Sequence, residues 1–208
     1  MLLTKIKNRI TKIIRKVIKF ALYKKIWEKK ISIISNNCVG TFLYREFGCE
    51  YLSPTINLQL SPCDYIKFCK NMNYYLSQKI EEVSNPDNSG FVALGGDKIT
   101  FPVGKLDDLI IYFQHYNDFT SAVKKWEKRK SRINYDNMYF ILIDTYCNIE
   151  TVKEFFSLSY KNKLFMTGNK ELLINQNCIL IDTNNKFWHQ GDWIKRFDFK
   201  NWFLGKKL

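Results

Sequence analysis

The 208-residue sequence predicts an α/β fold: a three-layer domain with a mainly parallel sheet and helices on both faces, preceded by an N-terminal basic amphipathic helix. Two observations predict this class. From Ile31 onward, short apolar runs of strand length alternate with segments of helical period, as in parallel sheets covered by helices. The composition, 46% hydrophobic and 16% aromatic, allows a sizeable core. We expect a helical arm over residues 1–30 and a single α/β domain over residues 31–208.

Residues 1–30 form the predicted arm. Apolar side chains recur there every three or four residues, with lysines and arginines on the opposite side, which is typical of an amphipathic helix. The segment holds eleven of the 33 basic side chains and one of the 20 acids, so most of the net charge of +13 belongs to it. Such a helix either lies on an anionic membrane surface or packs its apolar side on the domain or on a second subunit. The concentrated charge favours the membrane.

Several absences limit the function classes. No segment resembles a secretory signal or a membrane span, so we expect a cytoplasmic protein, peripheral on the inner face of the cell membrane, with reduced thiols. The six cysteines form no CxxC pair and no Cys/His cluster, so we expect no metal and no cofactor. Phosphate-loop and dinucleotide fingerprints are missing. We expect no nucleic-acid partner, because no basic patch is interleaved with aromatic residues. The oligomeric state is left open.

Apolar runs predict the strands of the domain, and a "GKLDD" turn precedes the third of them. The expected strands are 31–34, 98–101, 109–113, 138–143, 164–167 and 178–181. Helices are expected where capping residues precede a helical period. Ser61, Pro62 and Asp64 begin one that runs to about Lys79, Asp118 caps another, and residues 84–90 are a loop. The remaining expected helices are 40–47, 149–158 with Asn148 as its cap, and 198–204.

The first candidate site follows the first predicted strand. Ser35, Asn36, Asn37 and Cys38 stand between this strand and a helix, where ligands bind in open parallel sheets. Backbone N–H groups and the helix dipole favour an anion there, asparagine amides add donors, and a cysteine tends toward the thiolate. The same residue types also fill ordinary turns, because their side chains satisfy local backbone groups. Both readings stay open at this point.

Three further positions supply candidate groups. His115 directly follows the strand 109–113 and could act as a general base paired with Cys38 or Ser35, or merely cap a helix. Asp144 ends the strand 138–143 and could bind a sugar hydroxyl or cap the next helix. Arg129 and Arg132, one turn apart, could hold a phosphate or carboxylate or lie on a solvated helix face.

Six segments together resemble a known family. They are "ISIISNNCVG", "YLSPTINL", "DYIKFCKNMNYYL", "PVGKLDDLIIYFQHY", "AVKKWEKRKSRIN" and "LSYKNKLFMTG", and in this order they are similar to the bacterial domain of unknown function 1919 family. Its members are commonly described as exopolysaccharide biosynthesis proteins. The resemblance runs from about Ile31 to Gly168 and implies an α/β fold. It also marks Gly40 and Tyr116 as candidate substrate contacts.

The resemblance implies a role in capsule or exopolysaccharide biosynthesis. We expect a transferase of acyl or glycosyl type that acts on a sugar or lipid-linked sugar precursor near the cytoplasmic membrane face. Cys38 or Ser35 would be the nucleophile and His115 the base. Substrate contacts would come from Asn36, Asn37, Gly40, Tyr116, Arg129, Arg132 and Asp144. The alternative is a non-catalytic accessory or binding protein of the polysaccharide assembly machinery, recruited through residues 1–30.

Overall fold

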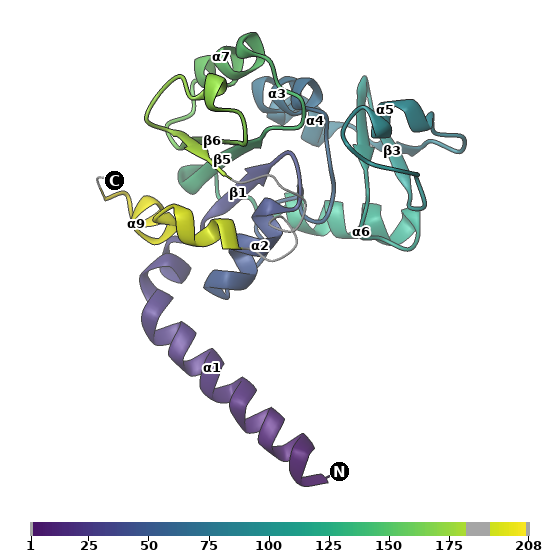
Figure 1. The fold of residues 1–208 in the computed structure, drawn as a ribbon. Coiled ribbons are helices and arrows are strands. Elements are labelled where there is room, and N and C mark those ends of the chain that lie inside the picture. Colours follow the sequence, from purple (N-terminus) through teal and green to yellow (C-terminus); the bar gives the residue numbers. More distant parts are fainter. Residues whose placement is uncertain (1, 182–191, 207–208) are drawn as a thin grey trace.

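The computed structural model describes residues 2–181 and 192–206 and shows a three-layer α/β domain with a projecting N-terminal helix (Figure 1). Its main sheet has four strands in the order β1-β5-β6-β7, and every neighbouring pair is parallel. This confirms the predicted fold class. The strands are β1 (Ser32–Ser35), β5 (Met138–Ile143), β6 (Lys163–Thr167) and β7 (Cys178–Leu180).

Helices cover both faces of this sheet because successive side chains of its strands point to opposite sides. Ile33, Ile141 and Met166 share one core with α2 (Val39–Phe47) and α9 (Phe199–Leu204). Ile34 and Phe165 belong to the other core, with α3 (Pro62–Lys70) and α7 (Ile149–Ser157). The continuous apolar runs of the sequence therefore reflect strands whose side chains are buried on both faces of the sheet.

A second, antiparallel sheet stands beside the first, and the sequence did not predict it. It contains β2 (Ile80–Glu82), β3 (Val103–Leu106) and β4 (Leu109–Tyr112) in that order. The strand expected at 109–113 exists as β4, whereas the strand expected at 98–101 is wrong. Ile99 and Phe101 instead pack around Phe91 of α5 (Asn88–Val92). This helix begins inside the loop expected at 84–90, so the expectation is wrong for residues 88–90.

The helix starts agree with the expected capping residues. The side chains of Ser61, Asp118 and Asn148 each accept a backbone N–H of the first turn that follows. The helix expected from Ser61 to Lys79 is interrupted at Asn71, and α4 (Met72–Ser77) is a separate helix. The other elements are α6 (Phe119–Lys130) and the 3-10 turns η1 (Tyr135–Asn137), η2 (Lys170–Leu172) and η3 (Asp192–Arg196).

Side chains close the outer edge of β1, where the sheet has no further strand. The Tyr44 hydroxyl accepts the N–H of Ile33 (2.9 Å) and donates to the carbonyl of Ile31 (3.1 Å). The Thr55 hydroxyl accepts the N–H of Ser35 (3.1 Å). Further along the same segment, Gln59 forms an antiparallel bridge with Tyr112 of β4. Residues 51–60 therefore connect the two sheets.

The first helix, α1 (Leu2–Lys29), leaves the domain as a long projection (Figure 1). Its C-terminal part packs on the domain: the Lys19 ammonium donates to the carbonyl of Glu46 (2.5 Å), the Trp27 indole to that of Phe47 (2.6 Å), and the Lys29 ammonium to that of Phe203 (2.9 Å). Upstream, apolar side chains are exposed, so this stretch does not dock on the domain's own core. They are Ile13, Ile14, Val17, Ile18, Phe20 and Leu22. Within the described residues, no helix has the length and apolarity needed to cross a bilayer.

Candidate functional site

Asn36 joins the carboxyl ends of two neighbouring strands. It follows β1 and is completely buried. Its amide nitrogen donates to the carbonyl of Ile143 (3.1 Å), and its amide oxygen accepts the N–H of Ile143 (2.8 Å). The side chain thus continues the β1–β5 ladder by one step. These two bonds occupy both polar ends of the amide and establish a structural role for Asn36. Its expected role as a hydrogen-bond donor to substrate stays a prediction.

Ser35 and Asn37 fold the chain from β1 into α2. The Ser35 hydroxyl donates to the carbonyl of Asn37 (2.7 Å) and accepts the N–H of Gly40 (3.3 Å). The Asn37 side chain accepts the N–H of Val39 (3.0 Å). A Cβ on Gly40 would lie 3.0 Å from the Ser35 oxygen, so the helix approaches the strand closely at this position. The first N–H groups of α2, expected to hold an anion, are therefore already bonded within the turn.

Cys38 begins α2 and forms no side-chain capping bond. Burial raises the pKa of its thiol to about 12, while the positive charge of Arg45 acts in the opposite direction. The thiol is accordingly protonated at neutral pH, in contrast to the expected thiolate, because loss of solvent outweighs the favourable charges near it. Its assignment as a nucleophile stays a prediction.

His115 follows β4, so it stands at the end of a strand of the antiparallel sheet rather than of the parallel one. The side chain is exposed. Partial burial, followed by the charge of Arg45, lowers the pKa of the imidazole. The imidazole is therefore neutral at pH 7, which is the form a general base requires.

The charge of Arg45 acts on both of these groups, the Cys38 thiol and the His115 imidazole. Arg45 lies on α2, is exposed, and forms no ion pair within residues 2–181 and 192–206. The β1–α2 turn and the segment after β4 thus both lie within electrostatic range of one guanidinium group.

Two cations four residues apart on α6, Lys125 and Arg129, lie against aromatic rings. The ammonium of Lys125 lies 5.3 Å from the ring centre of Tyr116. The guanidinium of Arg129 donates to the Tyr116 hydroxyl (2.6 Å) and lies 5.2 Å from the ring centre of Tyr51. Burial raises the pKa of Tyr116; Arg129 opposes this rise, and the Cys38 thiol adds to it. Tyr116 and Arg129 are therefore bonded to each other, and Cys38 lies within electrostatic range of Tyr116.

Arg132 and Asp144 occupy different surroundings. Arg132, in the turn after α6, pairs with Glu50 (2.5 Å) rather than with Arg129 around a shared anion. Asp144 follows β5, where one of its oxygens accepts the Thr167 hydroxyl (2.5 Å) and the other the N–H of Cys147 (2.9 Å). These bonds tie the ends of β5 and β6 together. Nothing in them tests a role in substrate binding.

The family model for Domain of unknown function (DUF1919) matches residues 9–203. The chain belongs to this family. A Haemophilus influenzae protein described as an uncharacterized protein is 30% identical over 210 residues, which cover 96% of this chain and 96% of that protein. Neither description names a reaction, a substrate or a partner.

In this DUF1919 chain, sequence reasoning identified Cys38, His115, Tyr116 and Arg129 but missed Arg45. The available signal was one arginine in the otherwise mostly apolar helix "VGTFLYREF". Asp182 and His189, considered from the sequence as a strand-end acid and a packing residue, lie outside the described residues. Within the described residues, no three His, Cys, Asp or Glu side chains gather as a metal site would require. All six cysteines are free thiols.

Proposed function

We propose that the protein is a transferase of acyl or glycosyl type in capsule or exopolysaccharide biosynthesis, and that it acts on a sugar or lipid-linked sugar precursor beside the cytoplasmic membrane. The polysaccharide setting rests on the resemblance of its ordered segments to a family commonly described in those terms. The transfer chemistry rests on the residues around Arg45.

The observation that carries the proposal is that the charge of the exposed Arg45 side chain acts on both the Cys38 thiol and the His115 imidazole. An exposed guanidinium without an ion pair in the described structure suits the phosphate or carboxylate of a sugar precursor. Lys125 and Arg129 place positive charge over the rings of Tyr116 and Tyr51, and these rings offer surfaces on which a sugar ring can pack. Cations with adjacent aromatic rings are a fitting environment for an anionic sugar.

In the proposed reaction, neutral His115 takes the proton of an acceptor hydroxyl. The acceptor oxygen forms the new bond to the carbon of the transferred group, and the bond from that carbon to the leaving group breaks with its electron pair on the leaving group. Arg45 and Arg129 balance the negative charge of the donor. Cys38, as a protonated thiol, contacts the substrate rather than attacking it.

The arm provides the membrane contact in this proposal. Its exposed apolar side chains and its eleven cations match the interface of an anionic leaflet. Lipid-linked precursors are then presented at the surface on which the domain sits.

The test is the composition of the polymer from cells that carry His115→Gln or Arg45→Gln in place of the natural chain. Loss of a general base lowers the rate about a hundredfold or more, so a polymer substituent or sugar should be missing or strongly reduced. Lys128→Gln is the matched control, because this exposed α6 residue removes one charge without touching the site. Normal polymer from both site variants, at normal protein levels, would overturn the proposal.

The accessory role is the second candidate, and the satisfied Ser35–Asn37 turn favours it. It predicts that the arm matters and the site does not. Deleting residues 2–17 removes exposed apolar residues while keeping the Trp27 and Lys29 contacts that attach α1 to the domain. Lost polymer in this truncation, with normal polymer in the Arg45 and His115 variants, would support the accessory role.

A further inference from the structure

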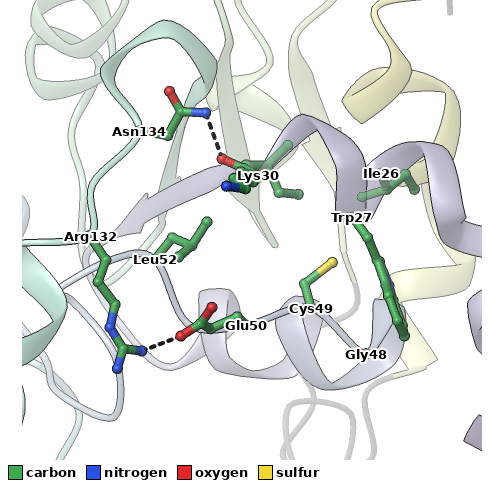
Figure 2. Close-up of a pocket in the computed structure, with 10 residues that line it drawn as sticks. Ile26, Trp27, Lys30, Gly48, Cys49, Glu50, Leu52, Arg132 and Asn134 are labelled. Atoms are coloured by element: carbon green, nitrogen blue, oxygen red, sulfur yellow. Dashed lines mark hydrogen bonds and ion pairs between the residues drawn. The ribbon is translucent and has the colours of Figure 1, made fainter.

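A cavity of about 740 Å³ lies at the C-terminal end of α1 (Figure 2). It lies at the amino end of β1, whereas the turn with Cys38 lies at the carboxyl end of that strand. Its walls come from the last turns of α1, the segment after α2, and the loop after α6. This volume is in the range of small-molecule sites.

One side of the cavity is apolar. Ile26, Trp27, Ile31 and Leu52 contribute to it. The Trp27 ring is held in place because its indole N–H is bonded to the carbonyl of Phe47 (2.6 Å). A fixed aromatic wall beside aliphatic side chains suits a hydrocarbon chain.

The rim is polar and carries a net positive charge. Arg132 and Glu50 form an ion pair across it (Figure 2). Lys30 lines the same rim and has no ion pair in the part of the chain that the structure describes. Its backbone is left-handed (φ 49°), a conformation that lysine rarely adopts, and Asn134 fixes it by donating to the carbonyls of Lys29 and Lys30. The structure thus holds an unpaired cation at the mouth of an apolar cavity.

We propose that this cavity binds a membrane lipid phosphate, with the hydrocarbon chain against Trp27 and Leu52 and the phosphate at Lys30 and Arg132. The charge of the rim matches the phosphate, and the apolar wall matches the chain. The cavity is also continuous with α1, whose exposed apolar side chains and cations favour an anionic leaflet. The inference rests on the proposed membrane contact only for the source of the ligand and is independent of the transfer reaction.

The experiment is a calorimetric titration of the full chain with decyl phosphate below its micelle concentration, with decanol and inorganic phosphate as separate arms. Decyl phosphate should bind saturably, decanol more weakly, and inorganic phosphate not measurably. Leu52→Trp, which fills the cavity, and Lys30→Asn, which removes the rim charge but tolerates the left-handed backbone, should each weaken binding about tenfold. Lys25→Gln, an exposed α1 residue that the cavity does not include, should leave binding unchanged.

Thermal unfolding of each variant verifies that it is folded. If Leu52→Trp does not fold, the binding affinity of Lys30→Asn alone tests the proposal. Amide NMR shifts on titration should concentrate at residues 48–52 and 132–134. Equal loss in Lys30→Asn and Lys25→Gln, or shifts confined to residues 13–22, would overturn the proposal and indicate only adsorption to the arm. Because binding is measured directly, an inactive transfer site would not affect the result.

Discussion

At the scale of single residues, Asn36 provides the sharpest stability prediction. Asn36→Ala leaves the N–H and the carbonyl of Ile143 without partners in a buried place, and it should lower the free energy of unfolding by about 2–4 kcal/mol. Asn37→Ala loses one bond at a half-buried turn and should cost about 1 kcal/mol. Urea unfolding measures both. Equal effects of the two substitutions would contradict the ladder role of Asn36.

The pKa of His115 should respond to Arg45. Burial first and the Arg45 charge second lower this pKa, so Arg45→Gln should raise it toward the ordinary histidine value without reaching it. Two imidazole signals are expected in NMR titrations, because the chain has two histidines, and His189→Gln assigns them. Lys128→Gln should cause no comparable change, and an unchanged or lower pKa in Arg45→Gln would show that Arg45 does not act on the imidazole.

The proposed activity should follow the same shift. A base works only when unprotonated, so the rate should fall as the pH drops through the pKa of His115. Because that pKa is lowered in the natural protein and raised again in Arg45→Gln, the acidic limb of the variant should lie at higher pH. Rates against pH with a purified acceptor measure this, and coincident acidic limbs would argue against His115 as the base.

Residue types at the candidate site could be predicted, but their partners could not. The spacing placed Ser35 and Asn37 in a turn before a helix, and both do lie there. The bond between Asn36 and Ile143 spans 107 residues, and no local pattern contains it. The same holds for Arg45, whose charge acts on His115 although the two residues are far apart in the sequence.

At the scale of elements, local sequence signals predicted where helices begin, but the sequence did not predict which strands pair. Ser61, Asp118 and Asn148 cap helices as expected, because a cap depends on neighbours in the sequence. The apolar run at 109–113 forms the strand β4, but its pattern does not indicate that β4 pairs with β3. His115 consequently lies after an antiparallel hairpin, a position that the alternating α/β reading could not anticipate.

The edge of β1 should depend on Tyr44. Tyr44→Phe keeps the ring but removes the hydroxyl that satisfies Ile31 and Ile33, and it should lower the free energy of unfolding by about 1–3 kcal/mol. Tyr23→Phe is the matched control, because the Tyr23 hydroxyl makes no hydrogen bond within the described residues and its ring packs on Phe47. Denaturant unfolding compares the two. Equal stabilities of the two variants would mean that β1 does not need this edge protection.

At the scale of the whole molecule, α1 presents its apolar side away from the domain. The Val17 side chain is 61% exposed, whereas that of Ile26 is only 1% exposed. The two residues are nine positions apart, which corresponds to two and a half helical turns, so they lie on opposite faces of the helix. The apolar side is therefore free for a partner. A second copy is an unfavourable one, because two arms with eleven cations and one acid each repel one another. An anionic bilayer has the opposite charge.

Val17→Glu should therefore reduce binding to vesicles that contain anionic lipid about tenfold or more, because it removes apolar area from the interface and adds a repelled charge. It should leave the thermal unfolding of the domain unchanged, since the Val17 side chain is 61% exposed. Val92→Glu is the matched control: Val92 is 49% exposed on α5, away from α1. Vesicle sedimentation at low and high salt measures both variants, and salt should weaken binding of the natural protein. Undiminished binding of Val17→Glu, or a shift from dimer to monomer in solution, would instead assign the apolar side of α1 to another copy of the chain.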